Sequence, residues 1–148
     1  ILEDYFKNKN EKWDKKLLAT DLSLNVLNQA EKGIYASEKI ALLPKSWTLN
    51  YFDKISSDFY QVKSSLRREV IYRRFNLLES IFPFKKKFHV IFCRNVMIYF
   101  DSETKEQLIH KLYEQLEYGG YLFIGHSESI NKERTKFKYI KPSVYRKI

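Results

Sequence analysis

Three short apolar segments of this sequence each end in polar residues, and helical patterns separate them. They are LLATDLS (17–23), IFCRNVM (91–97) and LFIGHSES (122–129). Alternating strands and helices are typical of a doubly wound α/β sheet. Ligands of such sheets bind outside the carboxyl ends of the strands. The pattern therefore predicts the fold class and a binding crevice at the polar ends of these segments.

Polar side chains stand directly behind the strand in VIFCRNVMIYFD (90–101). A run this apolar normally lies in a sheet covered on both faces, where polar groups need partners to replace lost water. We therefore expect Arg94 and Asn95 to bind a group at the end of the strand. In LLATDLS the comparable residue is Asp21, which either accepts the two ribose hydroxyls of a nucleoside or caps the following helix. Both interpretations of Asp21 stay open.

Two helices are predicted together with their ends. The first runs from Ser23, a favourable N-cap, to Gly33, a favourable C-cap. The second begins at Asp101 and ends at the pair Gly119-Gly120, with acidic residues in its first turn. The stretch KNKNEKWDKK (7–16) is predicted to be a solvated loop.

The middle of the chain is predicted to be a small antiparallel subdomain. DFYQV (58–62) and REVIYRRF (68–75) alternate large apolar and charged residues, as half-exposed strands do, and KSSLR (63–67) suits the turn between them. FKYI (137–140) and VYRKI (144–148) are predicted to form a second antiparallel pair. The predicted organisation is a partial α/β domain of residues 1–44 and 76–148, with an inserted β-subdomain at 45–75.

Charge and cysteine content limit the partners and the compartment. Lysine and arginine outnumber aspartate and glutamate by 27 to 18, and the formal net charge of +9 favours an acidic partner. Basic residues interleaved with aromatics in 60–75 could serve single-stranded nucleic acid, but a solvated outer face over a buried one is the favoured interpretation for most of them. Cys93 is the only cysteine, which favours a reducing, cytoplasmic compartment and a core residue over a nucleophile. No membrane-spanning run and no metal-ligand spacing is present in the sequence.

Four strings resemble the signature blocks of the CheR-type chemotaxis receptor methyltransferases. They are ATDLSLNVLNQAEKGIY (19–35), FNLLE (75–79), IFCRNVMIYFD (91–101) and GGYLFIGHSES (119–129). The resemblance implies a Rossmann-like class I methyltransferase sheet, with S-adenosylmethionine as cofactor and methyl esters of receptor glutamates as product. It implies the cytoplasmic domain of methyl-accepting chemotaxis receptors as partner, without nucleic acid or membrane insertion. The oligomeric state stays open.

The resemblance also implies roles for single residues. Asp21 matches the acid that holds the ribose hydroxyls, Asn76 and Leu77 match the pair beside the adenine, Asn95 and Val96 match residues lining the cofactor, and Tyr99 matches a tyrosine beside the transferred methyl. Tyr99 has a simpler interpretation as a packed aromatic residue.

The remaining polar residues of these strings are interpreted from charge and geometry. Arg94 either meets the substrate carboxylate or forms an ion pair with Asp101, Glu128 or another acid. His126, Ser127 and Glu128 adjoin in one extended segment and cannot align as a hydrolytic triad, so loop-shaping hydrogen bonds are expected of them.

One part of the family pattern has no counterpart in this chain. The four glycines, at 33, 119, 120 and 125, contain no G-x-G set for the loop after the first strand. We therefore expect an incomplete sheet whose first strand, between the strands ending at Asp21 and Asn95, is missing. The chain would be the carboxyl portion of a longer protein and would bind cofactor weakly alone.

Two alternative functions remain. A non-catalytic receptor-binding module could dispense with Asp21 and Asn95. A methyltransferase acting on nucleic acid would exploit the positive charge, but NVMIY (95–99) stands where amino-directed methyltransferases carry an Asn-Pro-Pro-aromatic string.

Overall fold

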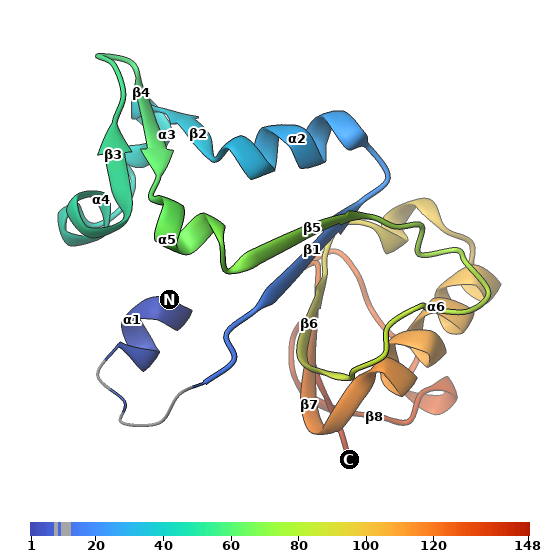
Figure 1. Cartoon of the computed structure of the whole chain (residues 1–148). Coiled ribbons are helices and arrows are strands. Elements are labelled where there is room, and N and C mark those ends of the chain that lie inside the picture. Colours follow the sequence, from blue (N-terminus) through green and yellow to red (C-terminus); the bar gives the residue numbers. More distant parts are fainter. Residues whose placement is uncertain (8, 10–12) are drawn as a thin grey trace. The chain divides into compact units, whose positions relative to one another are not determined.

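The computed structural model describes residues 1–7, 9 and 13–148, which form two compact units (Figure 1). Unit 1 comprises Ile1–Asn76 and unit 2 comprises Leu77–Ile148. Part of the loop predicted at 7–16, namely residues 8 and 10–12, lies outside the described residues. None of the helices in these ranges is long and apolar enough to cross a lipid bilayer.

Unit 1 is organised around a parallel pair of strands, β1 (Leu17–Asp21) and β5 (Val70–Arg74). Helix α2 (Leu24–Lys32) contacts both strands. Its N-cap is Ser23, whose hydroxyl accepts a hydrogen bond from the Val26 N–H at 3.3 Å. Its C-cap is Gly33, whose φ of 62° is the left-handed conformation that glycine adopts without strain. Both predicted helix ends are therefore confirmed.

A three-stranded antiparallel sheet completes unit 1, with the strands in the order β2-β4-β3. These strands are β2 (Ile34–Ala36), β3 (Phe52–Lys54) and β4 (Phe59–Val62). The short helices of the unit are α1 (Leu2–Phe6), α3 (Ser37–Ile40), α4 (Lys45–Tyr51) and α5 (Ser64–Arg67).

The predicted hairpin of residues 58–62 with 68–75 is wrong. The expected turn KSSLR contains helix α5, and β5 pairs in parallel with β1 while β4 takes β2 and β3 as its neighbours. Alternating apolar and charged residues indicate a half-exposed strand but do not identify its partner, because strand pairing is set by contacts far apart in the sequence. The subdomain boundaries at 45 and 75 stay a prediction.

Unit 2 is a four-stranded mixed sheet with one long helix. The strands are β6 (Phe88–Cys93), β7 (Leu116–Ile124), β8 (Phe137–Lys141) and β9 (Val144–Lys147), in the order β6-β7-β9-β8. β6 and β7 are parallel, whereas β9 is antiparallel to both β7 and β8, so the predicted pairing of the last two strands is confirmed. The mixed strands and helices of the two units confirm the predicted α/β class.

Helix α6 (Ser102–Gln115) packs on β7 through Leu108, Ile109 and Leu112, which are all buried. The predicted end of this helix at Gly119-Gly120 is wrong, because β7 begins directly at Leu116 and contains both glycines. A Cβ on Gly120 would lie 3.0 Å from the carbonyl oxygen of His89 in β6. The glycine therefore serves a close strand contact and not a helix end. Single-turn 3-10 helices, η1 (Met97–Tyr99) and η2 (Lys132–Arg134), lie in the loops.

The side chains of strand β6 are more exposed to solvent than its apolar sequence predicts. Val90 is 44% exposed and Phe92 68% exposed, and β6 is the edge strand of its sheet. The Phe92 ring is covered in part by Phe123, with the two ring centroids 4.7 Å apart. Among the described residues β1 pairs only with β5, and β6 only with β7, so each keeps an edge without a strand partner, as predicted.

The side chain of Ile124, which is 1% exposed, should stabilise unit 2 through packing. Replacing it by alanine (Ile124→Ala) should lower the free energy of unfolding by about 2–5 kcal/mol in urea denaturation, because a cavity replaces buried methyl groups. The matched variant Ile81→Ala changes a side chain that is 82% exposed and should cost less than about 0.5 kcal/mol. Equal losses in the two variants would contradict this packing.

Candidate functional site

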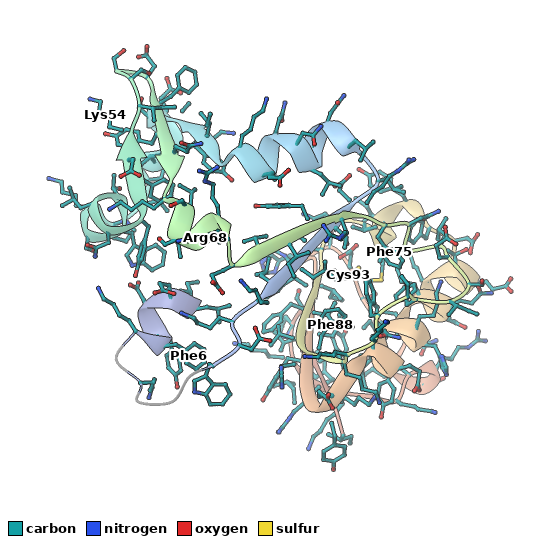
Figure 2. The ribbon with its side chains drawn as sticks, in the orientation of Figure 1. Phe6, Lys54, Arg68, Phe75, Phe88 and Cys93 are labelled. Atoms are coloured by element: carbon teal, nitrogen blue, oxygen red, sulfur yellow. The ribbon has the colours of Figure 1, made fainter. Side chains whose placement is uncertain are left out.

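Two of the predicted site residues meet at the carboxyl end of the β1–β5 pair in unit 1. Asp21, the last residue of β1, has Arg74 as its partner in the parallel register. The N–H of Phe75, labelled in Figure 2, donates a hydrogen bond of 3.1 Å to the carbonyl oxygen of Asp21. Asn76 follows directly. The pairing therefore brings Asp21 and Asn76 to one edge, where parallel strands place ligand contacts.

The exposed side chain of Asp21 uses one oxygen locally. Its Oδ1 accepts a hydrogen bond of 2.8 Å from the Ser23 N–H, which shapes the turn into α2. Its Oδ2 has no hydrogen-bond partner among the residues that the structure describes. The helix-capping interpretation is therefore right in part, because Asp21 supports the turn while Ser23 is the cap. One carboxylate oxygen stays available to a ligand.

The second cluster lies behind β6 in unit 2, where Cys93 ends the strand (Figure 2). Asn95 has a φ of 60°, in the left-handed region, and Val96 is right-handed with φ −111° and ψ −44°. Asparagine tolerates the left-handed conformation better than other residues with a side chain. Alternating hands of this kind point successive N–H groups into one concavity, an anion-binding nest. The Asn95–Met97 N–H groups form this nest.

The carboxylate of Glu128 fills the nest. Its Oε1 accepts hydrogen bonds from the N–H groups of Val96 at 3.1 Å and Met97 at 2.8 Å. Its Oε2 accepts from the N–H groups of Asn95 at 3.1 Å and Gly125 at 2.5 Å. Because Gly125 directly follows β7, one side chain joins the loops behind β6 and β7. The predicted loop-shaping role is confirmed for Glu128.

Gly125 is buried against this cluster and was not singled out by sequence reasoning. A Cβ at this position would lie 2.5 Å from the Oδ1 of Asn95 and 2.7 Å from the Oε2 of Glu128. A side chain here would therefore displace the side chains of Asn95 and Glu128 from their present positions. The signal available in the sequence was the glycine three residues before the glutamate in GHSE (125–128), at the end of an apolar strand.

Tyr99 ends the short helix η1, which begins at Met97. Met97 is 2% exposed and anchors the turn, whereas Tyr99 is 81% exposed. Its N–H donates to the carbonyl oxygen of Val96 at 3.3 Å, so Tyr99 stands next to the nest. The interpretation of Tyr99 as a packed aromatic residue is therefore wrong, and its hydroxyl is accessible.

The segment carrying Leu77 is held against α6 by Lys111. The Lys111 ammonium donates hydrogen bonds to the carbonyl oxygens of Leu77 at 3.0 Å and Glu79 at 2.7 Å. This positions the backbone of Leu77 within unit 2.

Arg94 is exposed and makes no ion pair with any residue in the described part of the chain. Both suggested acidic partners are occupied by N–H groups. Asp101 is the N-cap of α6 and accepts from the Thr104 N–H at 2.8 Å, a hydrogen bond that lowers the pKa of its carboxyl. The carboxylate of Glu128 already accepts hydrogen bonds from four backbone N–H groups. The guanidinium of Arg94 therefore remains available.

A pocket of about 360 Å³ in unit 1 lies away from Asp21. Its lining residues are Glu31, Ser64, Arg67, Arg68, Val70 and Tyr72. Val70 begins β5, so the pocket is at the opposite end of this strand from the Asp21 edge. No predicted site residue lines it. In the described ranges, no group of three or more histidine, cysteine, aspartate or glutamate side chains is arranged to hold a metal ion.

Comparisons with known proteins agree with the resemblance seen in the sequence. A family model described as the CheR methyltransferase, SAM binding domain, matches residues 1–146. A chemotaxis protein methyltransferase of Borreliella burgdorferi is 42% identical over 147 residues, which cover 99% of this chain and 52% of the relative. Chemotaxis protein methyltransferase Cher2 of Pseudomonas putida is 40% identical over 116 residues, covering 78% of this chain and 42% of the relative. The chain thus spans about half the length of these curated relatives.

The thiol of Cys93 should be unreactive in the folded protein. Burial, together with the nearby negative charge of Glu128, raises its pKa from 9.0 to about 11. At pH 8 this lowers the thiolate fraction about a hundredfold, and burial blocks access as well. Labelling with a thiol-specific disulfide reagent at pH 8 should therefore be at least about a hundredfold slower in native protein than in urea. Comparable rates would show that Cys93 is not a core residue.

Proposed function

This chain belongs to the CheR methyltransferase family, and we propose that the protein uses S-adenosylmethionine to methylate glutamate side chains of chemotaxis receptors. The observation that carries the proposal is the chemistry at the carboxyl ends of two strands, each of which has a parallel neighbour within its own unit. β1 ends in an exposed carboxylate, and β6 ends in a turn whose backbone is fixed by Glu128. Crevices at such strand ends are where α/β sheets bind nucleosides.

The residues present fit the cofactor. Asp21 would accept hydrogen bonds from the ribose hydroxyls through Oδ2, the oxygen that the local turn leaves available. Asn76 and Leu77 would flank the adenine, and Asn95 and Val96 would line the cofactor through side chain and backbone. The absence of a Cβ at Gly125 supports this assignment, because it gives Asn95 room in its left-handed conformation.

The bound cofactor would supply a methyl group that its sulfonium has already activated. The task of the protein is then to align the glutamate carboxylate with that methyl and to exclude water from it. The exposed hydroxyl of Tyr99 would donate a hydrogen bond that orients the carboxylate. The unpaired guanidinium of Arg94 would attract the carboxylate to the site. No group of the chain is required as a nucleophile.

The proposed partner is the cytoplasmic domain of methyl-accepting chemotaxis receptors, and the proposed location is therefore the cytoplasm. The net charge of +9 supports an acidic partner surface. The charge fits nucleic acid equally, but NVMIY (95–99) stands where amino-directed methyltransferases of nucleic acids carry an Asn-Pro-Pro-aromatic string.

The full natural protein, incubated with a receptor cytoplasmic domain and methyl-labelled S-adenosylmethionine, should transfer label that is released as methanol by base, as methyl esters are. The Tyr99→Phe variant should lower kcat about 3- to 10-fold, the loss of one hydrogen bond, while the Kd for cofactor changes less than about twofold. Tyr118→Phe is the matched control, because Tyr118 is 82% exposed and Tyr99 81%. Absence of base-labile label in the wild-type protein would refute the proposed reaction.

Asp21→Asn should raise the Kd for S-adenosylhomocysteine about 10- to 100-fold in calorimetry, because a neutral amide accepts hydrogen bonds from hydroxyls less strongly than a carboxylate. Asp14→Asn is the matched control. Asp14 is also exposed, and its Oδ1 also accepts from an N–H two residues later, that of Lys16, at 3.3 Å. It should leave the Kd unchanged. Similar effects of both variants would assign the loss to net charge and not to Asp21.

A further inference from the structure

We propose that Glu128 is a positioning residue for the cofactor, an internal anion that holds Asn95 and Val96 in their binding conformation. This inference rests on the proposed function, because it assigns a role to Glu128 in the same site. Glu128 does not contact the cofactor in this account and acts through the backbone of the residues that do.

Four backbone N–H groups donate hydrogen bonds to the two carboxylate oxygens of Glu128. Each carboxylate oxygen accepts two N–H groups, at distances between 2.5 and 3.1 Å. Glu128 is half-buried and makes no ion pair with any described residue, so N–H dipoles balance its charge. Hydrogen bonds to an ionised acceptor are about twice as strong as neutral ones. The glutamate therefore holds this turn more firmly than a neutral side chain would.

The left-handed backbone of Asn95 is the feature that depends on this anion. Asparagine adopts a φ of 60° at a smaller cost than other residues with a side chain, but the conformation still persists only where its surroundings fix it. Three successive N–H groups converge on Glu128 only while Asn95 keeps that conformation. Without the carboxylate, Asn95 can relax to a negative φ, which would redirect its side chain and turn the backbone of Val96 away.

The same carboxylate also fixes the spacing of two strand ends. Three of its donors belong to the loop behind β6, and the fourth, the Gly125 N–H, belongs to the loop behind β7. The hydroxyl of Ser143 donates to the carbonyl oxygen of Gly125 at 3.2 Å, so Gly125 is held on both sides. Because the Glu128 carboxylate occupies the nest, the nest cannot bind the carboxylate of the cofactor or of the substrate instead.

The Glu128→Gln variant tests the role with little change in shape. Glutamine offers one acceptor oxygen, so two of the four N–H groups lose their acceptor and face an amide N–H₂. Calorimetry on the full natural protein should show a Kd for S-adenosylhomocysteine at least about tenfold higher than in wild type. The control Glu114→Gln removes the same charge from an exposed position on α6 and should stay within about twofold of wild type.

Glu128→Ala supplies a second readout, because it empties the nest. Sodium formate should restore binding of S-adenosylhomocysteine to this variant by at least about threefold over sodium chloride at the same ionic strength, since formate can occupy the nest. NMR should also show the N–H groups of Val96 and Met97 exchanging with solvent at least about tenfold faster in Glu128→Gln than in wild type.

The outcomes separate this inference from the proposed function. A Kd for Glu128→Gln within twofold of a wild type that binds S-adenosylhomocysteine would overturn the positioning role and leave the proposed function standing. Loss of the native fold in both variants, seen by circular dichroism, would assign Glu128 to stability alone and also overturn it. If the wild-type protein bound no S-adenosylhomocysteine, the proposed function would fail. Unchanged amide exchange would then overturn the role of Glu128 independently.

Discussion

The carboxylate of Glu128 accepts hydrogen bonds from four backbone N–H groups, and the geometry behind β6 and β7 depends on it. An ionised acceptor among N–H dipoles is a strong and directional arrangement, and here it lies beside strained backbone at Asn95. Three features of unit 2 meet at this arrangement. Asn95 has its left-handed turn there, Gly125 approaches without a Cβ, and Tyr99 follows on a short helix anchored by Met97.

Parallel strand pairing explains why polar residues far apart in the sequence share one edge. Asp21 and the segment after Arg74 are separated by more than fifty positions, yet the β1–β5 register places them side by side. The β6–β7 register does the same for Asn95 and Gly125, because Cys93 pairs with Ile124. In both units the polar side chains stand at the carboxyl ends of the strands, which is the edge where sheets of this class bind ligands.

Features fixed by neighbouring residues could be predicted from the sequence. The caps Ser23 and Gly33 depend on local hydrogen bonds and on one backbone conformation, and the structure confirms both. The partner of β5 could not be predicted, because alternation of side chains is the same whether a strand pairs with β4 or with β1. Gly119 and Gly120 misled for a related reason, since glycine after a helical pattern indicates a helix end as readily as a close strand contact.

In the candidate site, too, some features could be predicted from the sequence and others could not. Its residues could be located, since Asp21 and Asn95 both follow apolar strands, and the structure places them at strand ends. The φ of Asn95 and the four donors to Glu128 could not be predicted, because both depend on how the loops behind two strands meet. The roles of all the site residues remain predictions, namely those of Asp21, Asn76, Leu77, Arg94, Asn95, Val96 and Tyr99.

The position of S-adenosylhomocysteine in a crystal structure of the full natural protein would decide between a bound cofactor at these strand ends and one elsewhere. We expect both ribose hydroxyls to lie within hydrogen-bond distance of the Asp21 carboxylate. We also expect the cofactor to contact Asn95 and Val96 while Glu128 keeps its four N–H donors. A cofactor bound away from Asp21 and Asn95, or a Glu128 carboxylate turned out of the nest, would contradict these expectations.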